Sequence, residues 1–227
     1  MKKFATSPFF TPIIFPLTWL VWVSFLFVMS ANNLPYLLEE HGILEKTTNF
    51  AYIPLLLAYV FFAKFFLTGS RDKKIDFVLF VLLGIAAFLR ELGIQHWLAS
   101  KDSTAFKSRF FLNPENPLSE KIVAGLILLT LLIVIVYLAI KYSKHLVVSF
   151  FKLNPTTWSI ATLCTVGIVG KFVDRFPSNY KKSTGVSLPE DIDVALEILE
   201  ETSETFLPII AAFILLQYWL IQKNRQN

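Results

Sequence analysis

The stretch Ile122–Ile140 reads IVAGLILLTLLIVIVYLAI and contains no charged side chain. As a helix it rises about 28 Å, close to the roughly 30 Å thickness of a bilayer's hydrocarbon core. A segment in that core must satisfy its backbone hydrogen bonds internally, as a helix does. These residues therefore predict a transmembrane helix, and with it an integral membrane protein.

The composition of the whole chain points the same way. Of 227 residues, 55% are hydrophobic and 17% are charged, against about 25% charged residues in ordinary soluble domains. The mean hydropathy is +0.58. Such a chain is neither disordered nor able to cover a water-soluble globule with polar groups. The single cysteine, Cys164, excludes an internal disulfide and a metal site built from several cysteines.

Five further stretches are predominantly apolar, although they are unequal in the length of their uncharged parts. We therefore predict an all-α fold, a single polytopic membrane domain over residues 1–227 with six transmembrane helices. The first span follows Met1-Lys2-Lys3, a start shared with secretory signals. Its apolar run is longer than the roughly 7–15 residues of such signals, so a retained span is expected. The spans are expected at about residues 12–31, 50–69, 75–93, 122–140, 156–173 and 205–222.

The distribution of charge predicts the orientation. With six spans, the N-terminus, the second and fourth connections and the C-terminus share one side, which carries eleven Lys and Arg residues and two acids. The other side carries ten Lys and Arg residues and fifteen acids. Because loops rich in Lys and Arg stay in the cytoplasm, both termini are expected there. The net charge of +4 then reflects topology, and no nucleic-acid partner is expected. The lysine-rich loops and compact length suggest a bacterial inner (plasma) membrane.

Two of the predicted spans have short uncharged cores. The third is free of charge only over residues 77–89 and the fifth over residues 156–170, which cover about 20–22 Å as helices. Arg90, Glu91 and Lys171 should therefore lie in the outer third of the bilayer. Unpaired charge is costly at that depth, so opposite charges are expected to come together there.

The segment Asp191–Glu204 supplies the acidic partners. It reads as a helix that leads into the sixth span, with carboxylates at i, i+3 and i+4 spacing. We predict an ionic cluster at the extracytoplasmic end of spans three, five and six. The predicted catalytic acids are Glu91, Glu200 and Glu201; the predicted anion-binding or substrate-binding residues are Arg90, Lys171, Arg175, Lys107 and Arg109; the predicted structural ion-pair residues are Asp174 and Glu204.

Two short amphipathic helices are expected on the extracytoplasmic surface. One covers Pro35–His41, and the other covers Ala105–Phe111 after a helix start at Asp102-Ser103-Thr104. In the second helix, Lys107 and Arg109 are placed to meet lipid phosphates.

No metal or cofactor is expected. His96, Glu91 and Glu201 offer nitrogen and oxygen ligands. Their spacing does not match the Glu-x-x-His pairs that bundle-type dimetal sites use.

Three classes of function remain open at this stage. The protein could bind or act on the headgroup of a lipid or other amphiphile from the extracytoplasmic side, it could be a small transporter, or it could be a non-catalytic scaffold or accessory subunit with a structural salt-bridge network. Membrane lipids are the expected partners. A pocket beside the charges would favour the first class, whereas a transporter needs a polar path to the cytoplasmic side, where Lys64 is almost the only ionisable residue within the spans.

Overall fold

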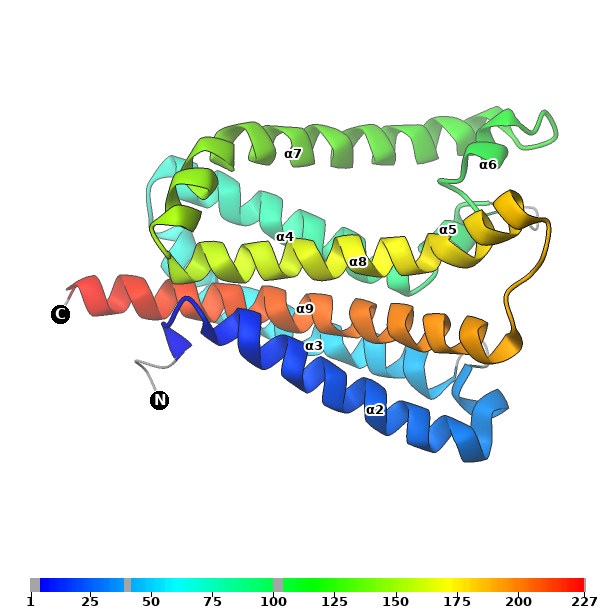
Figure 1. Ribbon diagram of the computed structural model, residues 1–227. Helices are drawn as coiled ribbons and strands as arrows, with labels where there is room; N and C mark the ends of the chain where they lie inside the picture. The colour runs from blue at the N-terminus through cyan, green and yellow to red at the C-terminus, as the bar shows by residue number, and fades with distance from the viewer. Residues whose placement is uncertain (1–4, 39–41, 100–103, 227) are drawn as a thin grey trace. The chain divides into compact units, whose positions relative to one another are not determined.

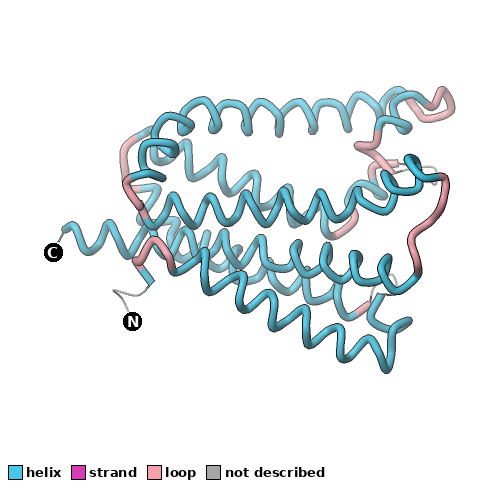
Figure 2. Tube along the Cα trace, viewed as in Figure 1, coloured by secondary structure: helices cyan, strands magenta, loops and turns pink. Residues whose placement is uncertain are grey.

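The computed structural model describes residues 5–38, 42–99 and 104–226 (Figure 1). These residues form helices joined by short loops, and none of the described residues is in a strand (Figure 2). The predicted all-α fold is confirmed. The helices are α2 (Phe10–Leu38), α3 (Ile43–Leu67), α4 (Arg71–Glu91), α5 (Ile94–Trp97), α6 (Ser108–Leu112), α7 (Leu118–Phe151), α8 (Pro155–Thr184) and α9 (Glu190–Gln226).

Five of these helices are long and apolar enough to cross a membrane, namely α2, α3, α7, α8 and α9. The chain is therefore an all-α, multi-pass membrane protein. The predicted third span corresponds to α4, which has 21 residues but does not reach the apolar content of the other five. Charged residues occupy both of its ends, which leaves the uncharged run of residues 77–89 in the middle.

The chain forms two compact units. Unit 1 contains Met1–Ala63 and Ser149–Asn227, and unit 2 contains Lys64–Val148. The helices α3 and α7 each continue from one unit into the other. The single polytopic domain stays a prediction.

In unit 1, α8 and α9 pack against each other and α2 packs against both. Leu26 of α2, Leu44 of α3 and Ile198 of α9 form a buried core cluster. Small residues of α8 allow the close approach of α9: a Cβ atom on Gly170 would lie only 3.2 Å from the Cβ atom of Ser203. Small side chains at such positions are typical of helix contacts in membranes.

Four chain segments meet at one end of unit 1. Gln217, near the end of α9, donates from Nε2 to the carbonyl of Ala5, before α2, at 2.8 Å. Its Oε1 accepts from the hydroxyl of Ser159, in the first turns of α8, at 2.7 Å. Trp219 contacts the ring of Phe62, near the end of α3, with 5.6 Å between the ring centroids. The start of α2, the end of α3, the start of α8 and the end of α9 therefore lie together.

In unit 2, α4 and α7 run antiparallel, because the start of α4 pairs with the end of α7. Lys141 Nζ of α7 lies 2.6 Å from Asp76 Oδ1 of α4, and the Tyr142 hydroxyl donates to Asp76 Oδ2. At the other end, the turn before α7 is held by Asn116, whose Nδ2 donates to the carbonyl of Phe110 at 2.9 Å.

Both predicted surface helices need correction. Over Pro35–His41, the backbone of α2 continues to Leu38 without a separate helix, and residues 39–41 lie outside the described residues. In the second region the helix is confined to Ser108–Leu112, because Phe106 has a left-handed φ of 76° and Lys107 is extended. The predicted helix start at Asp102-Ser103 also lies outside the described residues.

Candidate functional site

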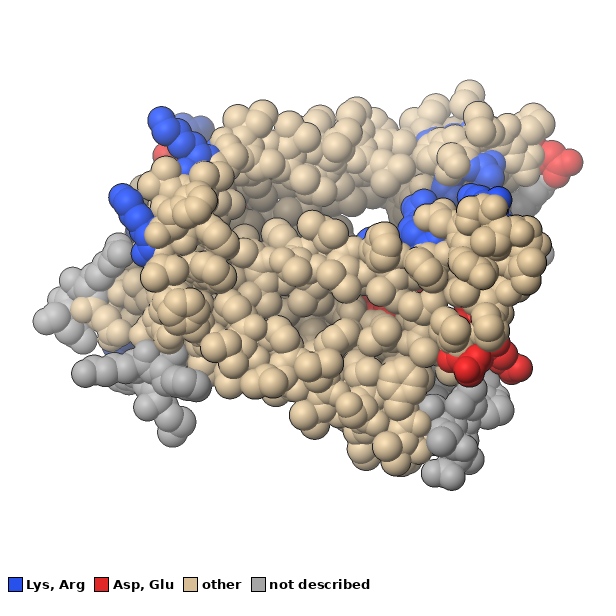
Figure 3. Space-filling model, in the orientation of Figure 1, with Lys and Arg blue, Asp and Glu red and all other residues tan. Residues whose placement is uncertain are grey.

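The acidic segment of α9 forms one wall of a pocket in unit 1. Residues three or four apart on a helix share a face, which brings Asp193, Glu197 and Glu200 together. Asp174 of α8 faces them, and the pocket has a volume of about 220 Å³. Figure 3 shows acidic side chains gathered at the end of unit 1 where α9 begins. The pocket is lined by Val173, Asp174, Pro177, Asp193, Leu196, Glu197 and Glu200.

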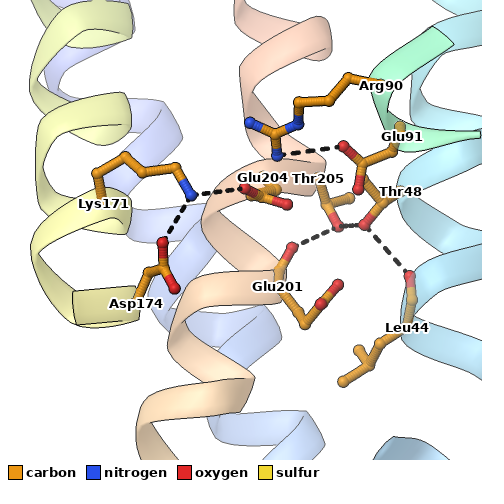
Figure 4. Close-up of polar contacts among 9 residues, drawn as sticks. All are labelled: Leu44, Thr48, Arg90, Glu91, Lys171, Asp174, Glu201, Glu204 and Thr205. Carbon is orange, nitrogen blue, oxygen red and sulfur yellow. Dashed lines mark hydrogen bonds and ion pairs between the residues drawn. The ribbon is translucent and has the colours of Figure 1, made fainter. Parts of the chain in front are cut away.

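Lys171 links the two helices beside this pocket (Figure 4). Its Nζ lies 2.8 Å from Asp174 Oδ2, one turn away on α8, and 3.7 Å from Glu204 Oε1 on α9. The structure thus brings Lys171 together with both residues that the sequence predicts as ion-pair residues. The Glu204 side chain is 15% exposed and that of Lys171 is 52% exposed, so the contact has one shielded and one solvated partner.

The carboxylates of this pocket precede the uncharged part of α9. The helix has 37 residues and rises about 55 Å, nearly twice the thickness of a hydrocarbon core. Its uncharged part begins at Thr205, and the segment Glu190–Glu204 comes before the predicted sixth span, residues 205–222. In that segment, partial burial and the neighbouring carboxylates Asp174 and Glu204 raise the pKa of Glu200 to about 7.

The other predicted residues of unit 1 have different surroundings. Arg175 is exposed and makes no ion pair with any described residue. Glu201 is partly buried beside a hydroxyl contact that joins α9 to α3: the Thr205 and Thr48 hydroxyls lie 2.7 Å apart, and the Thr205 hydroxyl donates to the Glu201 carbonyl at 3.0 Å (Figure 4).

Arg90 and Glu91 belong to unit 2, at the end of α4. Arg90 Nη2 lies 3.6 Å from Glu91 Oε2, and the Glu91 side chain is 11% exposed. The predicted pairing of these residues with carboxylates of the last helix, which belongs to unit 1, stays a prediction.

The predicted residues before α7 are exposed. Lys107 precedes α6 and Arg109 lies within it, while His96 lies in α5. Across residues 5–38, 42–99 and 104–226, no three His, Cys, Asp or Glu side chains are arranged to hold a metal ion. The ligand candidates His96, Glu91 and Glu201 accordingly form no such group.

The sequence analysis missed the buried polar contacts between helices. At the end of unit 1 where four segments meet, Thr11, Ser159 and Gln217 are fully buried, and the Thr11 and Ser159 hydroxyls lie 2.5 Å apart. A glutamine within an apolar run signals that a polar partner exists. The identity of that partner depends on how the helices pack, which no single segment reveals.

Comparison of the chain with protein-family models, with curated proteins and with solved structures finds no match.

Proposed function

We propose that the chain crosses the plasma membrane six times with both termini in the cytoplasm, as in a bacterial inner membrane. The support is a parity argument. The end of α3 and the start of α8 lie at the same end of unit 1, and α7 ends immediately before α8. If α7 crosses the bilayer, the start of α7 and the end of α3 lie on opposite sides of it. The chain between α3 and α7 must then cross the bilayer once, and among the described residues of that segment only α4 is long enough to do so.

This topology predicts a pattern of cysteine labelling. In a Cys164→Ser background, the Ser187→Cys variant should react with a membrane-impermeant maleimide in intact cells, because residue 187 lies in the extracytoplasmic loop before α9. The Ser70→Cys variant, between α3 and α4, should react only after permeabilisation. Both positions are exposed, so access to the reagent decides the outcome. Labelling of the Ser70→Cys variant in intact cells would contradict the proposed orientation.

We further propose that the protein binds an amphiphile with a cationic amine in its headgroup, such as a zwitterionic phospholipid. The observation that carries this proposal is the pocket of about 220 Å³ with four carboxylates in its walls. It lies just outside the membrane-spanning part of α9, at the depth expected for lipid headgroups. An ammonium group is complementary in charge to the four carboxylates, and the volume leaves room for the atoms attached to it.

Neighbouring groups complement the rest of such a headgroup. Lys171 and Arg175 on α8 carry positive charge for a phosphate, as the sequence predicts. Pro177 also lines the pocket, and because proline has no N–H it cannot donate the helical hydrogen bond that the Val173 carbonyl would otherwise accept. That carbonyl offers an acceptor to an ammonium group.

The predicted catalytic acids take different places in this proposal. Glu200 lines the pocket, and because its pKa is about 7 the charge that it offers to a bound ammonium group changes near physiological pH. Glu91 and Glu201 do not line it, so we assign the headgroup contact to Glu200.

Headgroup binding should depend on pH in a defined direction. Below pH 7 Glu200 is increasingly protonated and its charge is lost; above pH 7 it is ionised and attracts the amine. We expect dihexanoyl-phosphatidylethanolamine to bind the purified protein roughly fivefold more tightly at pH 8 than at pH 6. Thermal stabilisation in detergent, titrated with this lipid, measures the affinity.

The Glu200→Gln variant should remove this pH dependence. The matched control is Glu190→Gln, which neutralises an exposed carboxylate at the start of α9 that does not line the pocket. Equal stabilisation by dihexanoyl-phosphatidylglycerol, which has no amine, would contradict the proposal. A loss of thermal stability in the Glu200→Gln variant with no lipid dependence in the wild type would favour the scaffold function instead.

A further inference from the structure

A group of exposed cations lies at the end of unit 2 where α4 begins. Lys64 is in the last turn of α3, and α4 opens one turn later with basic residues. We call this group the basic patch. Figure 3 shows Lys and Arg side chains gathered over the corresponding end of α7. The basic patch consists of Lys64, Arg71, Lys73, Lys74 and Lys144, all of them exposed.

The ion pair between α4 and α7 fixes Lys144 in this group. Asp76 is bound by Lys141 and Tyr142, so the two antiparallel helices are in register there. Moving one turn back along α4 and one turn forward along α7 brings the first turn of α4 beside Lys144. The Asp76 carboxylate is paired with Lys141, and the residue is only 7% exposed. Its charge therefore does not compensate the cations of the basic patch.

The basic patch lacks internal compensation. None of its five residues forms an ion pair with a described residue. Asp72 is the remaining acid in the first turns of α4, so one carboxylate faces five cations. The Lys73 stem crosses the α3–α4 turn, since its Cδ would lie 3.1 Å from a Cβ atom on Gly69.

The position of α4 in a bilayer places the patch at the depth of the lipid phosphates. The uncharged run of residues 77–89 covers about 20 Å, roughly 10 Å less than the hydrocarbon core. If α4 crosses the membrane, its charged first turn is therefore drawn into the headgroup layer. Exposed apolar side chains, Leu67 and Ile75, lie on either side of the charged turn and mark the boundary with the acyl chains.

We infer that the basic patch binds the phosphates of anionic phospholipids in the cytoplasmic leaflet. The inference rests on the proposed crossing of α4, and it concerns a different end of the chain and a different lipid class from the amine pocket. Orientation by the positive-inside rule requires only a surplus of Lys and Arg in the loop. Five uncompensated cations at the depth of the phosphates are, in addition, complementary to a cluster of anionic headgroups. The ion pair between Asp76 and Lys141 holds them in register.

Lipid retention by the purified full-length protein tests this inference. The protein is reconstituted in vesicles of equal parts phosphatidylcholine and phosphatidylglycerol, extracted with mild detergent, and analysed for retained lipid. We expect phosphatidylglycerol to be enriched roughly tenfold over its bulk proportion. The triple variant Arg71→Gln/Lys73→Gln/Lys74→Gln should retain the two lipids in nearly equal amounts.

The control variant is Lys46→Gln/Lys181→Gln/Lys182→Gln, which removes the same charge from exposed positions of unit 1 and should keep the enrichment. Loss of enrichment in both variants, or in neither, would overturn the inference. So would displacement of phosphatidylglycerol by millimolar inorganic phosphate, which would indicate a site for free anions, or by an acidic polypeptide, which would indicate a protein-binding surface. Failure of the α4 crossing is detected separately by the cysteine labelling, and failure of the amine pocket by the titration with phosphatidylethanolamine.

Discussion

Asp76→Ala should lower the free energy of unfolding of the purified protein by about 2 kcal/mol, because it removes a buried carboxylate that accepts two hydrogen bonds. Asp76 is 7% exposed and accepts hydrogen bonds from Lys141 and Tyr142. Without the carboxylate, α4 loses both of these contacts with α7. Thermal or chemical unfolding in detergent, followed by circular dichroism, measures the loss.

The neighbouring Asp72→Ala variant is the matched control, since Asp72 is exposed one turn earlier on α4. It should change the free energy of unfolding by less than about 0.5 kcal/mol. The double variant Asp76→Leu/Lys141→Met should be more stable than Asp76→Ala, because it leaves no charge buried alone. If Asp76→Ala is as stable as the wild type, the ion pair does not hold α4 against α7, and the register used for the basic patch is wrong.

The Gln217→Leu variant should lower the free energy of unfolding by about 2 kcal/mol. It should also loosen the packing of the start of the chain against α9. Gln217 is fully buried, and its side chain binds both the Ala5 carbonyl and the Ser159 hydroxyl. The leucine side chain fills a similar volume but removes both hydrogen bonds, each of which contributes about 0.5–1.5 kcal/mol to stability. Hydrogen exchange of the first turns of α2, measured by mass spectrometry, should become faster.

The exposed Asn224→Leu variant, two turns further along α9, should change neither the stability nor this exchange. If hydrogen exchange in α2 of the Gln217→Leu variant is as slow as in the wild type, the contact with Ala5 does not stabilise the N-terminal segment.

The acidic face of α9 was predictable because helical spacing alone determines it: Asp193, Glu197 and Glu200 lie on one face wherever the helix packs. The contact of Lys171 with Asp174 follows from the same rule within α8. Its contact with Glu204 depends in addition on the close approach of α8 and α9 at Gly170. The pocket was not predictable from α8 or α9 alone, because residues of both helices, including Pro177, form its walls.

The pairing of Asp76 with Lys141 illustrates what one sequence does not contain. Both residues lie on the side predicted to be cytoplasmic, and nothing in the spacing of α4 or α7 determines their register. The same is true of Thr48 and Thr205, which are ordinary hydroxyl residues in apolar helices until the packing brings them within 2.7 Å. Whether a segment forms a helix is determined largely by its own residues, whereas these contacts depend on residues far apart in the sequence.

The acidic first part of α9, Glu190–Glu204, also affects how ligand affinities must be compared. A dense row of carboxylates in water gathers counter-ions, which any incoming amine has to displace. The Debye length falls from about 30 Å at 0.01 M salt to about 8 Å at 0.15 M, so the long-range attraction of the row extends far into solution only in dilute buffer. Titrations of this protein are therefore comparable with one another only at a single, stated ionic strength.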